Sequence, residues 1–293
     1  MAIKDVYNRE KLLGRLFESL MTQTDKNFIW MVVDDGSIDN TELFIKKCQK
    51  DADFEIIYIK QQNGGKHRAH NTAVKNCQTD YFMIVDSDDF LNVESIKILN
   101  SLINKIDNSN SICGIVGCRF IYDTNKPLFK YLPDIEKASL RELYQKYKFK
   151  GDTMLVFKSN LLKEHLFPEI EGEKFISENV VFDQIGSKYS LLVTNEIIYY
   201  GEYQQDGYTN NIYKVNIKNP KGYFMSLFSA VQYSLNFKNR LRYMIKYLVW
   251  GKKCSFKYEY SNMNFKSKII FFIAYPISIL LFLMKKPKNF FIK

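Results

Sequence analysis

The first 110 residues alternate between two patterns of apolar positions. Short runs rich in apolar residues, typical of buried parallel strands, occur at 28–33, 55–60 and 81–85. Segments with apolar residues at helical spacing lie around them, at 10–22, 41–50, 67–76 and 93–106. Strands that alternate with helices predict an α/β fold, with a Rossmann-like, mostly parallel sheet flanked by helices. In such sheets ligands bind beyond the carboxyl ends of the strands.

The pattern changes after residue 110. A strand-like run occupies 112–122, a polar and aromatic stretch with a short helix follows it, and a further α/β stretch runs from 151 to about 200. Residues 222–250 are predicted to be helical, and 269–284 form an uncharged apolar run. The α/β part of the chain therefore ends near residue 210.

Charge divides the chain at the same place. Residues 1–210 contain 26 Lys and Arg against 31 Asp and Glu, a net charge of −5, whereas residues 211–293 contain 16 Lys and Arg and one acid, Glu259. We therefore expect an α/β domain over 1–210 and a basic, aromatic-rich helical extension over 211–293. Such a basic block favours an anionic surface, either lipid or nucleic acid. Because no nucleic-acid-binding motif occurs, a nucleic-acid partner is not expected.

Cysteine usage bears on the compartment. The five cysteines form no CxxC pair, and no secretory signal opens the sequence. This pattern predicts a reduced, cytoplasmic protein.

A cluster of carboxylates, Asp86-Ser87-Asp88-Asp89, follows the predicted strand 81–85. Carboxylates at a strand end can hold a hard divalent ion together with the phosphates of a nucleotide diphosphate, whose departure the ion assists. An acidic turn alone is more often solvated than metal-bound. Its position after a buried strand favours the metal site.

Two further polar clusters follow the other strands. The sequence DDGS at 34–37 is either a tight acidic turn with Gly at positive φ or a carboxylate that accepts a hydrogen bond from N3–H of uracil. The sequence NGGK at 63–66 is either an ordinary Gly turn or a phosphate site, since glycines permit close backbone approach and a basic helix start attracts anions.

Together, in this order and at strand ends, the three clusters resemble the family 2 glycosyltransferases of the GT-A fold. The motifs that carry the resemblance are DDGS at 34–37, NGGKxxAxN at 63–71 and DSDD at 86–89, with support from 7–9 and 39–41. The resemblance covers roughly residues 5–205. The resemblance implies inverting transfer of a hexosyl or N-acetylhexosaminyl group from a nucleotide diphosphate-sugar, usually UDP-linked, with Mg²⁺ or Mn²⁺.

The resemblance also implies a donor half at about 1–122, an acceptor half at about 123–210, and roles for single residues. Asp35 would contact the base, Lys66 would lie near the nucleotide, Asp86 near the ribose, and Asp88, with Asp86, would bind the metal. The full set implied for nucleotide-sugar binding is Tyr7, Asn8, Asp34, Asp35, Gly65, Lys66, Asp86 and Ser87.

Inversion needs a general base on the acceptor side of the sugar. The family often supplies an acidic pair there, and the matching positions in this chain are Glu178 and Asn179. Because an amide cannot act as a base, Glu178 is the candidate and Asp183 the reserve; an exposed glutamate at a helix start is the alternative interpretation of Glu178. Residues 202–207 resemble a downstream family segment that would close over the site.

One departure concerns the first strand. The family has an apolar run there, whereas this chain has only Met1–Val6, with Lys4 and Asp5 inside it. Together with Asn179 this departure motivates a rival hypothesis, a catalytically weak or inactive GT-A-fold partner in a membrane-bound assembly. The intact carboxylates favour the enzyme: Asp35, Asp86, Asp88 and Glu178.

The apolar run 269–284 predicts membrane association. Its 16 residues would reach about 24 Å as a helix, short of a hydrocarbon core of roughly 30 Å, and Pro276 interrupts it. We expect a helix in the plane of an anionic membrane surface, with a full span or a buried core helix as the alternatives. By family analogy, a peripheral or monotopic enzyme on the cytoplasmic face of the cell membrane would suit a lipid-linked saccharide acceptor in cell-surface polysaccharide synthesis.

Overall fold

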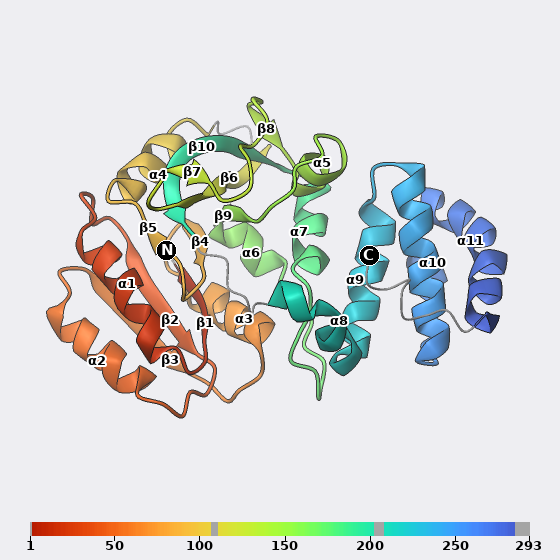
Figure 1. The fold of residues 1–293 in the computed structure, drawn as a ribbon, viewed down its shortest axis with the longest axis horizontal. Coiled ribbons are helices and arrows are strands. Elements are labelled where there is room, and N and C mark those ends of the chain that lie inside the picture. Colours follow the sequence, from red (N-terminus) through yellow and green to blue (C-terminus); the bar gives the residue numbers. More distant parts are fainter. Residues whose placement is uncertain (1, 107–110, 202–207, 285–293) are drawn as a thin grey trace.

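The computed structural model describes residues 2–106, 111–201 and 208–284. Figure 1 shows a sheet flanked by helices and, beside it, a lobe formed by the C-terminal helices. The predicted α/β class is confirmed.

The part of the sheet that lies in the predicted donor half is parallel, as predicted. Its strand order is β3-β2-β1-β4, and all three neighbouring pairs run in the same direction. The four strands are β1 (Ala2–Val6), β2 (Ile29–Asp34), β3 (Glu55–Lys60) and β4 (Tyr81–Val85). The short polar start of the chain thus forms β1 between β2 and β4.

The other half of the sheet is mixed. Strand β9 (Thr153–Lys158) lies antiparallel between β4 and β6 (Ile112–Ile121), and β10 (Ser190–Tyr200) runs parallel to β6. Short antiparallel strands pair with these: β5 (Phe90–Leu91), β7 (Lys126–Pro127) and β8 (Lys137–Ala138). The mostly parallel prediction therefore holds for the donor half but not for the whole sheet.

Helices cover both faces of the sheet. Successive residues of β2 belong to two separate apolar cores, because side chains alternate across a strand: Trp30 and Val32 pack with α1, and Met31 and Val33 with α3. The helices of this part are α1 (Glu10–Met21), α2 (Thr41–Asp51), α3 (Lys66–Asn76), α4 (Ser95–Ile103), α5 (Leu140–Gln145), α6 (Ser159–Glu164) and α7 (Asn179–Gly186).

The C-terminal helices have a core of their own, built on Phe224, Tyr247 and Trp250. The helical stretch predicted at 222–250 is two helices, because the chain turns at 234–236 and the Asn236 side chain caps the second by accepting from Asn239 N at 2.9 Å. The elements are α8 (Tyr208–Lys218), α9 (Pro220–Tyr233), α10 (Phe237–Lys253), a 3₁₀ turn (Tyr260–Asn262) and α11 (Phe265–Leu283).

Helix α11 contains the apolar run and continues through Pro276. It packs against α10 along a narrow stripe, whose buried residues are Ser267, Ile270, Ala274 and Ser278. Most of its other apolar side chains face outward; Phe272 is 66% exposed and Leu280 59%. The helix is therefore not a core helix of the described lobe.

Candidate functional site

The polar clusters meet at one edge of the sheet, beyond the carboxyl ends of β1, β2 and β4. Asp35 N donates to Val6 O at 2.8 Å, and Asn8 N donates to Ser37 Oγ at 2.9 Å, so the turns after β1 and β2 are joined. The DSDD turn follows β4, and β4 pairs with β1 on the side of β1 that faces away from β2. This is the edge where ligands bind in open α/β sheets.

Asp35 organises the glycine loop that precedes α3. It is 2% exposed, its Oδ1 accepts from Gly64 N at 2.9 Å and from Gln61 Nε2 at 2.7 Å, and its Oδ2 accepts from Gly65 N at 2.7 Å. Two backbone donors on one carboxylate fix the loop in place. The carboxylate still has acceptor capacity for a further donor.

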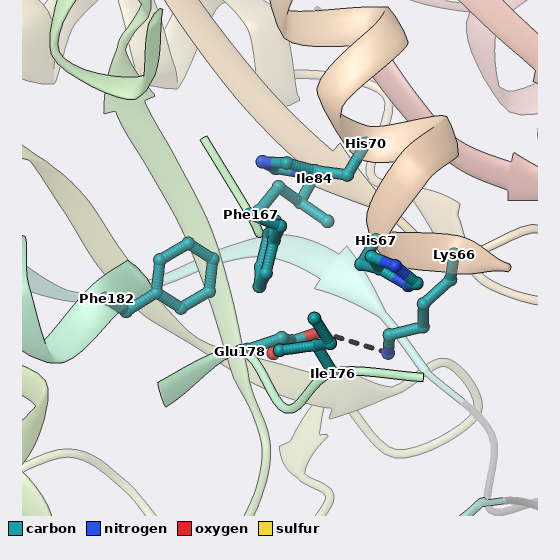
Figure 2. A pocket seen from close by; sticks show the side chains of 8 residues that line it. All are labelled: Lys66, His67, His70, Ile84, Phe167, Ile176, Glu178 and Phe182. Carbon is teal, nitrogen blue, oxygen red and sulfur yellow. Dashed lines mark ion pairs between the residues drawn. The ribbon is translucent and has the colours of Figure 1, made fainter. Parts of the chain in front are cut away.

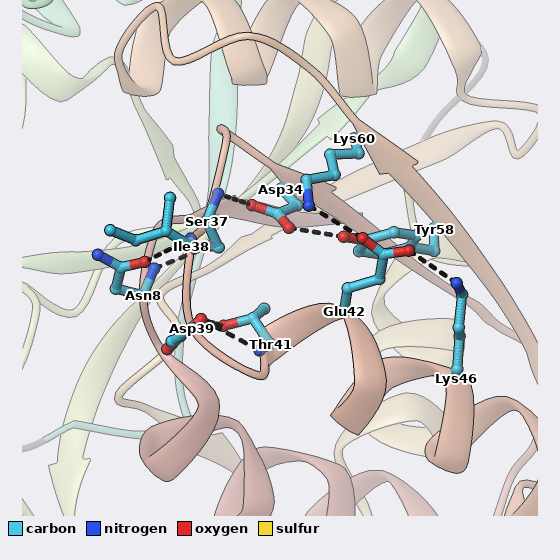
Figure 3. A network of polar contacts seen from close by, with 10 residues as sticks. All are labelled: Asn8, Asp34, Ser37, Ile38, Asp39, Thr41, Glu42, Lys46, Tyr58 and Lys60. Carbon is cyan, nitrogen blue, oxygen red and sulfur yellow. Dashed lines mark hydrogen bonds and ion pairs between the residues drawn. The ribbon is translucent and has the colours of Figure 1, made fainter.

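Asp34 has a different environment from Asp35, and Figure 3 shows the side chains around Asp34. It is fully buried, its Oδ1 accepts from Ser37 N at 2.7 Å, and its Oδ2 accepts from the Tyr58 hydroxyl at 2.6 Å. Asn8, at positive φ, accepts from Ile38 N at 3.0 Å. The side chains of Asp34 and Asn8 therefore hold the turns together. A ligand would contact the backbone that these side chains position.

Gly65 is required where it is. Its φ of +91° and a Cβ that would lie 1.9 Å from the Lys174 carbonyl oxygen exclude any other residue. It precedes α3 directly, and no side chain caps that helix. Unsatisfied backbone donors at a helix start favour an anion.

Lys66, the first residue of α3, connects the predicted donor half with the predicted acceptor half. Its Nζ lies 3.1 Å from Glu178 Oε1, and Figure 2 shows this ion pair among the side chains that line a small pocket. The pocket is otherwise lined by His67, His70, Ile84, Phe167, Ile176 and Phe182. The Glu178 side chain is 38% exposed, so a substrate hydroxyl has access to it.

His67 lines the same pocket and was not a predicted site residue. It is 1% exposed, and neither ring nitrogen has a hydrogen-bond partner among the described residues. Burial lowers the pKa of the imidazole, so the ring is neutral at physiological pH. The sequence feature that could have indicated His67 as a site residue is its position directly after the lysine of NGGK.

The carboxylates after β4 differ in their partners. Asp86 Oδ2 accepts from Arg119 Nη2 at 2.8 Å, and Asp89 Oδ2 accepts from Arg119 Nη1 at 2.9 Å and from the Tyr199 hydroxyl at 2.8 Å. Asp88 is half-buried, and its carboxylate has no hydrogen-bond or ion-pair partner in the described part of the chain. Burial raises the pKa of Asp89 to about 7, although the Arg119 charge opposes this.

Arg119 was also missed from the sequence. It is a charged residue inside the otherwise apolar strand β6, and that contrast is a signal for a buried pairing. It forms ion pairs with both Asp86 and Asp89, so Asp88 is the carboxylate of this turn that has no cation partner among the described residues.

The donor set fits a divalent ion held jointly with a ligand. The described residues contain no group of three His, Cys, Asp or Glu that could form an all-protein metal cage. One hard carboxylate oxygen at a sheet edge is, however, what Mg²⁺ or Mn²⁺ uses when substrate phosphates supply further ligands. Asp88 offers that oxygen, whereas Asp86 already shares its Oδ2 with Arg119.

The remaining predicted residues are placed as follows. Tyr7 is 44% exposed at the end of β1, and Ser87 is 7% exposed. Asp183 points away from the pocket, because Arg141 Nε donates to its Oδ1 at 2.7 Å, and Arg141 Nη2 and Ser229 also bond its Oδ2. Only Glu178 of the two base candidates faces the pocket. The predicted closing loop, 202–207, lies outside the described residues.

Comparisons with known proteins agree with this arrangement. Residues 3–166, more than half of the chain, match the sequence profile of Glycosyl transferase family 2. Glycosyltransferase GlyA of Streptococcus pneumoniae serotype 4 is 30% identical over 177 residues, which cover 57% of this chain and 25% of that protein. GlyG of the same organism is 25% identical over 209 residues, 66% of this chain and 68% of that protein.

Another relative is the poly(ribitol-phosphate) beta-N-acetylglucosaminyltransferase TarS of Staphylococcus aureus strain MW2. It is 27% identical over 174 residues, 57% of this chain and 29% of that protein. This chain therefore spans about a quarter of the length of GlyA and somewhat more of TarS.

Solved structures show the same fold. S. aureus TarS 1-349 in complex with UDP-GlcNAc has a TM-score of 0.61 at 18% identity, over 95% of this chain and 80% of that chain. Mannosyltransferase PcManGT from Pyrobaculum calidifontis, in complex with GDP-Man and Mn²⁺, has a TM-score of 0.54 at 12% identity, over 97% of this chain and 87% of that chain. The GT-A prediction for the fold is confirmed.

Proposed function

The chain belongs to glycosyl transferase family 2, and from this premise we propose that it transfers a sugar, with inversion, from a UDP-sugar to an acceptor hydroxyl. The observation that carries the proposal is the Lys66–Glu178 ion pair at 3.1 Å. A cation suited to the donor diphosphate and a carboxylate suited to a base line one pocket. Transfer needs both groups around one sugar.

The donor would occupy the sheet edge. Asp35 and the turns that Asp34 and Asn8 hold would receive the nucleoside, and the start of α3 with Lys66 would receive the diphosphate. Asp86 would face the ribose. Asp88 would hold Mg²⁺ or Mn²⁺, which when bound supplies neutralisation of the leaving diphosphate.

Glu178 would act on the acceptor side. Its carboxylate takes the proton of the acceptor hydroxyl while the hydroxyl oxygen bonds to the anomeric carbon from the face opposite the diphosphate. The bond from that carbon to the diphosphate oxygen breaks, and UDP leaves with the electron pair. One displacement of this kind inverts the anomeric configuration.

Relatives support the choice of substrates. TarS is named as an N-acetylglucosaminyltransferase and has been solved with UDP-GlcNAc, and a further relative, of Staphylococcus epidermidis, is named a teichoic acid poly(glycerol phosphate) polymerase. The TarS name and its UDP-GlcNAc complex favour a UDP-hexose or UDP-N-acetylhexosamine donor. A lipid-linked saccharide of a cell-surface polysaccharide is the proposed acceptor.

A donor screen tests the proposal. The chain is mixed with several UDP-sugars and Mn²⁺, and UDP release is measured with and without saccharide acceptors. We expect release with at least one donor, loss of release with EDTA, and recovery with added Mn²⁺. The rival, a non-catalytic assembly partner, would be favoured if no donor gave release and titration with UDP and Mn²⁺ gave no heat.

Helix α11 supports the proposed membrane location, for which the cytoplasmic face is the proposed side. Its 19 residues have a mean hydropathy of 1.8, only 22% of the apolar window is buried, and the helix is about 28 Å long. Because one face already packs on α10, we propose that α11 lies in the plane of the membrane rather than across it. Lysines on the same lobe would contact anionic headgroups, among them Lys252 and Lys268.

Charges on the outer face of α11 should release the protein from lipid. The double substitution Phe272→Glu and Leu280→Glu removes two exposed apolar side chains, each worth about 1.5–3 kcal/mol when buried. We expect co-sedimentation with vesicles that contain phosphatidylglycerol to fall at least tenfold. The matched control is Leu43→Glu on α2, which is 65% exposed and should leave sedimentation unchanged. Equal loss in both variants would refute the assignment of α11.

A further inference from the structure

The backbone at 173–176 passes between two glycines that belong to different parts of the molecule. On one side a Cβ at Gly65, before α3, would lie 1.9 Å from the Lys174 carbonyl oxygen. On the other side a Cβ at Gly222, in the first turn of α9, would lie 2.5 Å from the Phe175 carbonyl oxygen. The segment that leads to Glu178 is therefore in close contact with both the donor loop and the C-terminal helices.

Side chains fasten this segment to the start of α9. Glu173 is 6% exposed, and its two oxygens accept from Lys221 N at 2.8 Å and Gly222 N at 2.7 Å, a favourable place for a carboxylate at a helix N-terminus. Asn219 Oδ1 accepts from Lys174 N at 2.8 Å and from Phe175 N at 3.1 Å. Glu173 thus accepts from the backbone at the start of α9, and Asn219 accepts from the backbone of the segment 173–176.

A second attachment follows Glu178 directly. Asn179 Nδ2 donates to the Ser226 carbonyl oxygen at 3.0 Å, and the Ser226 hydroxyl donates to Asn179 Oδ1 at 2.7 Å. The Ser229 hydroxyl donates to the Asn179 carbonyl oxygen at 3.0 Å. Figure 1 shows α9 beside α7, the helix that begins at Asn179.

We propose that α9 positions the catalytic carboxylate: Asn179 and Asn219 are positioning residues that hold Glu178 opposite Lys66. The proposal rests on the proposed role of Glu178 as base. Backbone on both sides of Glu178 is tied to one helix of the C-terminal lobe, so that lobe completes the site as well as carrying the apolar helix α11.

The hydrogen bonds at position 179 explain why an amide suits this position. The amide donates to a carbonyl and accepts from a hydroxyl at once, which a carboxylate cannot do. A carboxylate there would also lie close to the Asp183 carboxylate, since Asn179 Nδ2 is 3.3 Å from Asp183 Oδ2. Restoring the acidic pair that is common in the family should therefore lower activity in this chain.

The test compares Asn179→Asp and Ser226→Ala with the wild-type chain and with Asn104→Asp, a matched change at an exposed position. We expect Asn179→Asp to lower kcat between tenfold and about 10²-fold, the range for small misplacement of a catalytic group, with the Kd for UDP and Mn²⁺ unchanged. Ser226→Ala should lower kcat in the same direction by less. Asn104→Asp should match wild type.

A double-substitution cycle separates positioning from general destabilisation. If Asn179 acts through Glu178, Asn179→Asp should have no further effect on kcat in the Glu178→Gln background. An equal loss in both backgrounds, or a rise in kcat for Asn179→Asp alone, would overturn the positioning role while the enzyme stays active. Absence of UDP release by wild type with every donor would overturn the proposed function, and the positioning role with it.

Discussion

Replacing Glu178 by Gln is expected to lower kcat by about 10²- to 10⁴-fold, the usual contribution of a general base. Gln has the same size but cannot take the proton of the acceptor hydroxyl. Lys66 stays in place and loses its carboxylate partner at 3.1 Å, so more of its charge is available to the donor diphosphate. The Kd for UDP should therefore be unchanged or lower. Initial rates of UDP release measure kcat, and calorimetric titration with UDP and Mn²⁺ measures the Kd.

The matched control for this substitution is Glu169→Gln. Glu169 is also partly exposed, at 46% of its side chain, and also faces a cation, with Oε2 3.6 Å from Arg68 Nε. Its variant should keep kcat within a few-fold of wild type. Wild-type turnover by Glu178→Gln would reassign the base, and a parallel loss in both variants would indicate a structural effect of the segment before α7.

Replacing Asp88 by Ala is expected to lower kcat/KM by at least about 10²-fold, because a metal contributes several kcal/mol of charge stabilisation and each 1.4 kcal/mol is tenfold. The loss should be accompanied by a rise in the Mn²⁺ concentration that gives half-maximal activity. Steady-state rates over a range of Mn²⁺ concentrations measure both effects.

Two variants show whether the effect belongs to Asp88. Asp123→Asn, on the exposed turn after β6, removes a charge elsewhere and should leave the Mn²⁺ dependence unchanged. Asp86→Asn removes a partner of Arg119 and should affect the donor KM more than the Mn²⁺ dependence. If Asp88→Ala kept the wild-type Mn²⁺ dependence, Asp88 would not be the metal ligand.

Much of the donor half could be predicted from the sequence because its information is local. The apolar runs at 28–33, 55–60 and 81–85 correspond to β2, β3 and β4 within one residue, since the interior of a parallel sheet is apolar on both faces. Each run stops at the polar cluster that follows it. The short polar start of the chain was the weak point, and β1 forms there because β2 and β4 offer backbone partners on both sides.

The acceptor half was less predictable. Strand β9 inserts antiparallel between β4 and β6, and no periodicity within 151–200 specifies its neighbours. The helical stretch at 222–250 was predicted without its break, because Ser234 and Asn236 differ little in pattern from the polar residues on a helix surface. Nothing in the apolar pattern indicated that α9 would contact the segment before Glu178.

By itself the sequence determined the parallel donor sheet, the order of its polar clusters and membership in the family, all of which depend on short windows of residues. Only the tertiary structure decided which of the similar carboxylates is available. Arg119 forms ion pairs with Asp86 and Asp89, Arg141 forms one with Asp183, and Glu178 faces Lys66. These partners lie far apart along the chain, and strand order and helix packing alone bring them together. The energy of a carboxylate depends on the charges and donors within a few ångströms of it, whatever their place in the sequence.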